Sequence, residues 1–184
     1  GLVLPPSLCS GQIARLAAQR LNQGDLPARL GLSRFAALVH TEGCGVSGGA
    51  NEDIYARILL GYLTHPSVSL ALLLEHGCER THNDAVRHYL NARGIGFDHL
   101  GFASVQMDGG LDKVRHKIGQ WFIRELGEDS ELISEPVGAQ ALRLGLTTVG
   151  PVPESISRAL AGLVRRLVAG AATVVIAENA SVLA

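Results

Sequence analysis

The sequence predicts an α/β fold: a Rossmann-like, doubly wound and mostly parallel sheet of about six strands, with helices on both faces. Short apolar segments alternate along the chain with segments whose apolar residues recur every three or four positions. Most of the short segments are continuous apolar runs, as strands buried on both faces require. The chain has 184 residues, 47% of them hydrophobic, which suits one domain with one sizeable core.

Six short segments are predicted as strands. They are residues 2–4, 35–39, 68–74, 99–105, 142–149 and 173–177. Five helices are predicted between them, each with one apolar stripe. The stripes are Ile13/Leu16/Ala17/Leu21, Ile54/Ile58/Tyr62, Val86/Tyr89/Leu90, Val114/Ile118/Trp121/Phe122 and Ile156/Leu160/Leu163/Val164/Leu167.

Right-handed crossovers in such an alternation give a parallel sheet that is covered on both faces. The polar segment 127–140 breaks the alternation and contains Pro136 and Gly138. We expect it to be a loop or a short excursion that faces a partner.

Charge and hydropathy exclude two classes of partner. The formal net charge is −1 and the basic residues are scattered, so we expect no nucleic-acid binding. The longest apolar runs, 69–74 and 171–177, are far shorter than the roughly 20 residues of a membrane helix. We therefore expect a soluble, cytoplasmic protein that does not enter a membrane.

Three cysteines are each placed just after a predicted strand. Cys9 follows the first strand, Cys44 the second and Cys78 the third, and each has a glycine within two residues. In an open parallel sheet, ligands bind beyond the carboxyl ends of the strands. We expect the three thiols to meet at that rim, where thiolates favour iron–sulfur clusters, zinc or other soft metals.

Two other interpretations of these cysteines remain open. Cys9 and Cys78 would be small buried hydrophobic residues, as free cysteines usually are. Alternatively, Cys44 and His40 would form the thiolate–imidazolium pair of a cysteine hydrolase, although this leaves the other two thiols without a role.

Further polar residues fall in the same rim loops. The candidate metal or substrate ligands are His40, Glu42, His76, Glu79 and His82. The remaining histidines, at turns, on helix surfaces or at the opposite rim, are expected to be bystanders: His65, His88, His99 and His116.

A glycine-rich turn precedes the helix that begins near Asn51. Its glycines are Gly43, Gly45, Gly48 and Gly49. Free N–H groups there would cradle an anion, or the turn is a strand-to-helix connection in which Ser47 or Asn51 caps the helix. At the end of the fourth strand Ser104, Gln106 and Asp108 would orient substrate hydroxyl groups.

Three segments, LCSGQIA, HTEGCGVSGG and GCE, carry a family resemblance. In this order and at these separations they resemble the altronate and galactarate dehydratases, which are sugar-acid hydro-lyases. The similarity runs from about Val3 to about Gly119 and includes VQMDGG.

The resemblance implies a metal-dependent hydro-lyase that dehydrates an aldonate or aldarate to a 2-keto-3-deoxy acid. The implied cofactor is iron, as Fe²⁺ or an iron–sulfur cluster, with Cys9, Cys44 and Cys78 as its ligands. His40 would be the base or a ligand, and Glu42 and Glu79 would be acid groups or would hold the ligands. The implied substrate-binding residues are Ser10, Gln12, Thr41, Gly43, Gly45 and Gln106.

The chain also departs from that family. Members are longer, and the segment after residue 142 lacks their glycine-rich, cysteine-bearing run. We therefore expect a single α/β domain over residues 1–184 that is part of a longer multidomain protein. Its partners would be the remaining domains or a partner subunit. Self-association would use Ile123, Leu126, Ile133 and Val137. The alternative function is a non-catalytic module that binds a sugar acid.

Overall fold

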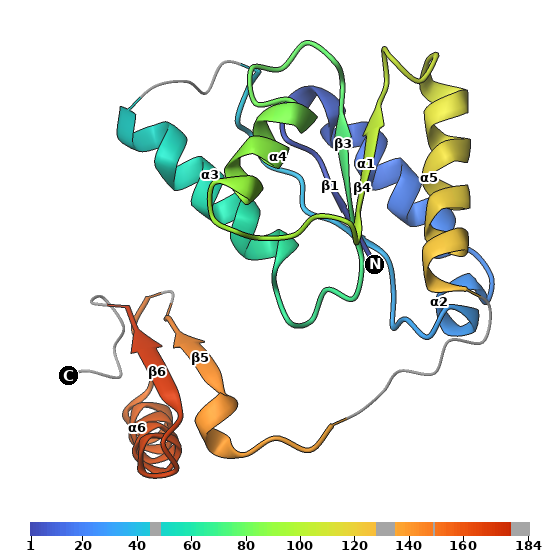
Figure 1. Cartoon of the computed structure of the whole chain (residues 1–184). Helices are drawn as coiled ribbons and strands as arrows, with labels where there is room; N and C mark the ends of the chain where they lie inside the picture. The colour runs from blue at the N-terminus through green and yellow to red at the C-terminus, as the bar shows by residue number, and fades with distance from the viewer. Residues whose placement is uncertain (45–48, 128–134, 149, 178–184) are drawn as a thin grey trace. The chain divides into compact units, whose positions relative to one another are not determined.

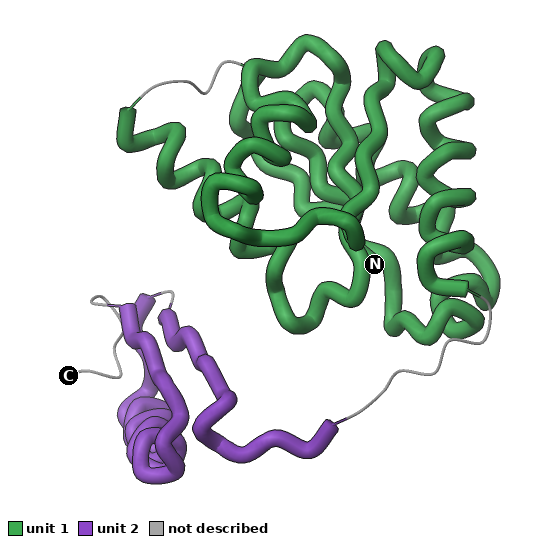
Figure 2. Tube along the Cα trace, in the orientation of Figure 1, with its two compact units in different colours: residues 1–132 green, residues 133–184 purple. Residues whose placement is uncertain are grey.

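The computed structural model describes residues 1–44, 49–127, 135–148 and 150–177. The contacts divide the chain into two compact units, Gly1–Leu132 and Ile133–Ala184, which Figure 2 colours separately. None of the helices in these described ranges is long and apolar enough to cross a membrane.

The first unit is built on a four-stranded parallel sheet. Its strands are β1 (Leu2–Leu4), β2 (Ala36–Ala37), β3 (Ala71–Glu75) and β4 (Leu100–Ser104), in the order β2-β1-β3-β4. All residues of β1 and β3 are buried, which is why these strands are continuous apolar runs in the sequence. The α/β class, the parallel pairing and these four strands are therefore confirmed.

Helices cover both faces of this sheet (Figure 1). They are α1 (Leu8–Leu21), α2 (Leu26–Arg29), α3 (Gly49–Leu63), α4 (Asn83–Asn91) and α5 (Leu111–Leu126). On one face Leu72 and Leu74 pack in a core with α1 and α5, and on the other Ala71 and Leu73 pack with α3 and α4.

Neighbouring strands β1 and β3 send their chains to opposite faces of the sheet. The helix after β1, α1, belongs to one core, whereas the helix after β3, α4, belongs to the other. A crevice opens where adjacent parallel strands diverge in this way, and ligands bind there in doubly wound folds. The loops that carry Cys9 and Cys78 start at this point.

The second unit is a βαβ unit with its own sheet. Strand β5 (Arg143–Leu146) pairs in parallel with β6 (Thr173–Ile176), and α6 (Glu154–Ala169) connects them; a short 3₁₀ helix, η1 (Ala139–Ala141), precedes β5. The prediction of one six-stranded sheet is wrong, because the described strands form sheets of four and two.

The burial of β5 and β6 explains why these two strands form a sheet of their own. Residues of β5 and β6 alternate between exposed and half-buried, as in a sheet covered on one face only, whereas β1 and β3 are buried throughout. The polar segment 127–140 that interrupts the sequence pattern spans the division between the units.

We predict that Gly101→Ala destabilises the first unit. An added Cβ would lie 2.7 Å from Cε2 of Trp121 and 2.9 Å from Cδ1 of Leu72. Overpacking of this kind costs about 1–3 kcal/mol of unfolding free energy. Urea denaturation measures it, with Gly61→Ala as the control.

The control adds the same methyl group inside α3, where the new Cβ meets nothing within 4 Å apart from its chain neighbours and the backbone of the helix itself. It is expected to leave stability unchanged or to raise it by up to about 1 kcal/mol. Equal unfolding free energies for the two variants would contradict the packing described for β4.

Candidate functional site

The structure brings the thiols together at the carboxyl end of the sheet. Cys9 lies in the first turn of α1, Cys44 follows β2 and Cys78 follows β3. The Sγ atoms of Cys9 and Cys44 are 3.7 Å apart although the residues are 35 positions apart in sequence. The Cys78 thiol adds, after the hydrogen bond to Cys44 and desolvation, to the raised pKa of Cys9. The prediction that the three thiols share one rim is confirmed.

The thiols are accessible rather than core residues. Cys9 and Cys78 are exposed and Cys44 is half-buried, so the interpretation of Cys9 and Cys78 as buried hydrophobic residues is wrong. The hydrogen bond to Cys44, then desolvation and the nearby thiols, raise the pKa of Cys9. Desolvation, the Glu79 carboxylate and Cys44 raise the pKa of Cys78.

The loops that carry the thiols are tied together by backbone hydrogen bonds. The N–H of Leu8 donates to the carbonyl oxygen of Glu42 at 2.7 Å, which joins α1 to the loop after β2. The N–H of Arg80 donates to the carbonyl oxygen of Cys44 at 3.0 Å, which joins that loop to the one after β3.

The Glu79 side chain makes the third connection. One carboxylate oxygen accepts hydrogen bonds from the Ser7 hydroxyl at 2.8 Å and the His76 N–H at 2.6 Å, and the other accepts from the Gly77 N–H at 2.7 Å. Desolvation pushes the pKa of Glu79 upward, but the backbone N–H groups and the hydroxyl outweigh it, so the pKa lies below its usual value.

Both ring nitrogens of His40 are engaged. Nε2 lies 2.9 Å from the carbonyl oxygen of Pro5, which can only accept, so Nε2 carries the proton. Nδ1 then accepts from the N–H of Glu42 at 3.2 Å. The phenol of Tyr55 donates to the next carbonyl, that of Pro6, at 2.5 Å, and its ring meets the imidazole edge-on.

These contacts give His40 a positioning role. His40 and Tyr55 hold the two carbonyl groups that precede α1, and so fix the entry to the helix that bears Cys9. They also remove support for a Cys44–His40 hydrolase pair, because neither nitrogen is directed at the thiol. The use of His40 as a base remains a prediction.

Glu42 differs from the other two candidate acid–base residues. It is exposed, and within the described residues its carboxylate makes no hydrogen bond or ion pair. Together with His40, Tyr55 and Arg15 it borders a cavity of about 470 Å³ that is otherwise largely apolar. Glu42 is therefore a carboxylate that is available to a small molecule in this cavity, whose lining contains none of the three cysteines.

His76 belongs to the same rim. Its Nδ1 lies 3.5 Å from Sγ of Cys78 and 3.5 Å from Nε2 of Gln106. Gln106 also donates its backbone N–H to the carbonyl oxygen of His76 at 3.0 Å. The position of His76, two residues before Cys78, is the sequence signal that makes it a candidate.

The remaining candidates are distributed as follows. Ser10 is buried and bonds Glu79, whereas Gln12, Thr41 and Gly43 are exposed near the thiols. Gly45, Ser47 and Gly48 lie outside the described residues, so the anion-cradle interpretation of that turn remains a prediction.

Two polar groups that sequence analysis singled out are structural. His82 caps α4, because its Nδ1 accepts from the N–H of Ala85. Asp108 accepts from the N–H of Ser104 and forms an ion pair with Lys117, which holds the turn after β4. Two residues that matter for the rim, Ser7 and Tyr55, were not singled out, because nothing in their local sequence marks them.

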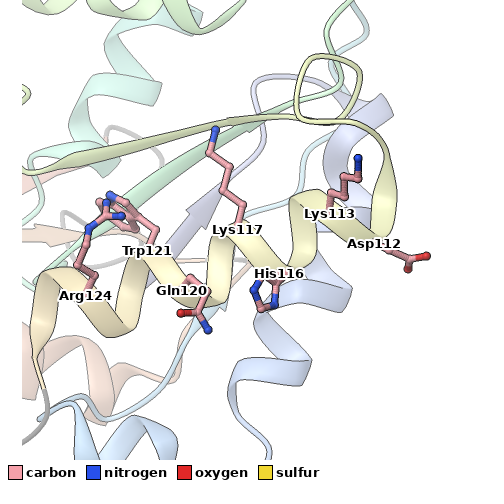
Figure 3. Close-up of a pocket in the computed structure, with 7 residues that line it drawn as sticks. All are labelled: Asp112, Lys113, His116, Lys117, Gln120, Trp121 and Arg124. Atoms are coloured by element: carbon pink, nitrogen blue, oxygen red, sulfur yellow. The ribbon is translucent and has the colours of Figure 1, made fainter.

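A second concave surface lies away from the thiols. Figure 3 shows that its seven lining side chains all come from α5, from Asp112 to Arg124, around a groove of about 420 Å³. It includes His116, which sequence analysis treats as a bystander, but none of the three cysteines.

The thiol pair has the spacing of metal ligands. Two sulfur atoms bound at about 2.3 Å to one tetrahedral ion lie about 3.8 Å apart, and Cys9 and Cys44 are 3.7 Å apart. Within residues 1–44, 49–127, 135–148 and 150–177, however, no group of three or more His, Cys, Asp or Glu side chains is arranged to hold a metal ion. The three thiols as placed therefore do not form a complete set of metal ligands.

Comparison with known proteins agrees with this architecture. Residues 2–126, from β1 to the end of α5, match the model of the D-galactarate dehydratase/altronate hydrolase second domain. Comparisons with curated proteins and with solved structures give no match. The matched region covers more than half of the chain and contains all three thiols. The chain therefore belongs to the D-galactarate dehydratase/altronate hydrolase family, through the second domain of that family.

Proposed function

We propose that this chain is the thiol-bearing domain of a metal-dependent hydro-lyase that dehydrates an aldonate or aldarate to a 2-keto-3-deoxy acid. The observation that carries the proposal is the 3.7 Å separation of the Cys9 and Cys44 sulfurs, in a chain of this family. Cys9, Cys44 and Cys78 would hold iron, as Fe²⁺ or a cluster. When bound, the iron would supply Lewis acidity toward the substrate carboxylate or the departing hydroxyl group.

The reaction is a β-elimination. A base removes the proton on the carbon next to the substrate carboxylate, and the hydroxyl group on the following carbon leaves as water. The enol that remains becomes the 2-keto acid. Glu42 is the residue that we assign to proton removal, because its carboxylate is exposed beside Cys44 and makes no bond within the described part of the chain.

The other rim residues would orient the reactants. His40 and Glu79 have their polar atoms engaged by the backbone and by hydroxyl groups, so they would position the loops rather than exchange protons with substrate. Gln106 and Thr41 would bind substrate hydroxyl groups. Remaining domains of a longer protein, or a partner subunit, would complete the enclosure of the substrate.

A second function, binding of a sugar acid without catalysis, is favoured because the polar atoms of His40 and Glu79 are already hydrogen-bonded within the chain. A module that binds a sugar acid without turning it over needs loops held in place and no free acid–base pair. It would use the same cavity beside Glu42 and would give a bound complex but no keto product.

Replacing each thiol tests the metal claim. Cys9→Ser, Cys44→Ser and Cys78→Ser are each expected to lower the iron content of anaerobically purified protein at least about tenfold, because a hydroxyl is a poor replacement for a thiolate ligand. Elemental analysis measures the iron. The control is Met107→Ser, which removes a sulfur that is 82% exposed in the loop after β4.

Iron content that is unchanged in all three cysteine variants would contradict the assignment of the thiols as ligands. Full activity on a sugar acid in wild-type protein without metal would contradict the metal dependence itself.

Formation of a 2-keto product distinguishes the hydro-lyase from the binding module. Wild-type protein, in its full-length form, is expected to convert one member of a sugar-acid panel to a 2-keto-3-deoxy acid. Glu42→Gln should lower that rate by a factor of about 10² or more, while the substrate still raises the melting temperature. The control is Asp98→Asn, which removes an exposed carboxylate just before β4, at the other end of the strands.

Ligand-induced stabilisation without keto product in the wild type would establish the binding module instead. An unchanged rate in Glu42→Gln would exclude Glu42 as the base.

A further inference from the structure

Glu79 occupies the centre of the hydrogen bonds that join the thiol loops. We propose that Glu79 is a positioning residue whose buried carboxylate fixes the relative placement of the three thiols. It is not an acid or base in the reaction. The inference rests on the proposed function only in taking the thiols as metal ligands; the geometry itself involves residues of this chain alone.

The carboxylate connects residues on both sides of Cys9 with Cys78. Oε1 accepts from the Ser7 hydroxyl at 2.8 Å, and the Ser10 hydroxyl, shared with the Ser7 carbonyl oxygen at 3.3 Å, lies 3.5 Å away. Ser7 is the N-cap of α1 and Ser10 lies in its first turn, so the two residues flank Cys9. Oε2 accepts from the N–H of Cys78 itself at 3.1 Å. A single side chain therefore links two thiol-bearing segments that are about 70 residues apart in sequence.

The segment with the third thiol, Cys44, is hydrogen-bonded to Arg80, the residue after Glu79. The N–H of Arg80, adjacent to Glu79, bonds the carbonyl oxygen of Cys44 at 3.0 Å. Any displacement of residues 79–80 would thus move Cys44 and Cys78 with respect to Cys9. The Glu79 residue is only 5% exposed, so solvent cannot readily replace these bonds.

The local backbone is shaped to receive an anion. Gly77 has φ of +114°, a left-handed conformation that glycine adopts most readily, and the consecutive N–H groups of His76, Gly77 and Cys78 all point at the Glu79 carboxylate. Successive backbone N–H groups that converge in this way form an anion-binding nest. Here the anion is a side chain of the same loop.

A neutral side chain of the same shape cannot make these contacts. An ionised carboxylate is acceptor-only on both oxygens, whereas a glutamine amide accepts on one oxygen and donates from its nitrogen. In Glu79→Gln, either the two N–H groups of Gly77 and Cys78 or the donors on the Ser7 side would face an N–H₂ group. We expect the thiol loops to move apart in that variant.

Glu75 provides a matched control. It is also a buried carboxylate at the end of β3, and its Oε2 accepts from the N–H of Asn83 at 2.5 Å, at the start of α4. This hydrogen bond reaches none of the thiol-bearing segments. Glu75→Gln therefore tests loss of a buried negative charge and of one acceptor oxygen, without loss of the connection between thiols.

Cobalt titration under reducing, anaerobic conditions tests the inference. Co²⁺ bound by thiolates gives sulfur-to-cobalt charge-transfer absorption, which reports the number of sulfur ligands independently of activity. Glu79→Gln is expected to bind Co²⁺ about 10–100-fold more weakly than wild type, as is typical when the partners that hold ligands are lost, and to give weaker absorption per bound ion. Glu75→Gln should match wild type in both.

A second variant distinguishes loss of the carboxylate from loss of the fold. Glu79→Ala leaves the nest without its carboxylate. Added formate is expected to restore the charge-transfer absorption of cobalt-loaded protein. Formamide, which has a similar size but no charge, should not restore it. Equal cobalt affinity in Glu79→Gln and Glu75→Gln, or no restoration by formate, would overturn the inference. Cobalt that binds wild type without sulfur absorption would instead overturn the proposed thiolate site.

Discussion

The carboxylate of Glu79 is the interaction on which the candidate site depends. The sheet places the loops after β1, β2 and β3 at one rim, but parallel strands alone leave those loops free to diverge, and at the β1/β3 crevice their chains turn to opposite faces. Hydrogen bonds from the Ser7 hydroxyl and from the N–H of Cys78 bring two of them back together at Glu79. The fold brings the thiol-bearing segments to the same rim, and the buried Glu79 carboxylate holds them at fixed positions there.

The surroundings of Cys9 and Cys78 do not favour nucleophilic chemistry at these two thiols. The hydrogen bond to Cys44 and desolvation raise the pKa of Cys9, and desolvation and the Glu79 carboxylate raise the pKa of Cys78. A catalytic nucleophile needs the opposite environment, one that lowers the thiol pKa. A bound cation would reverse this balance by replacing the protons and neutralising the accumulated charge. Metal binding by these thiols is our proposal on that ground.

Sequence periodicity predicts the first sheet because β1 and β3 are buried on both faces, and it predicts the rim because each cysteine directly follows a strand. It does not distinguish β5 and β6, whose apolar residues resemble those of core strands although the pair is covered on one face only. The role of Glu79 is also beyond such reasoning, because its partner Ser7 is 72 positions away and only the folded chain brings them together. The same holds for His40, whose bond to Pro5 spans 35 positions.

Glutamates of this rim with similar positions in the sequence therefore differ in their surroundings and in the roles that we propose for them. Glu42 and Glu79 both lie within two residues of a cysteine, yet one is exposed and the other buried among donors. X-ray absorption at the iron edge of anaerobically loaded protein measures whether the three thiols bind one metal. We expect sulfur neighbours at about 2.3 Å from the iron. A first coordination shell of nitrogen and oxygen atoms alone would contradict it.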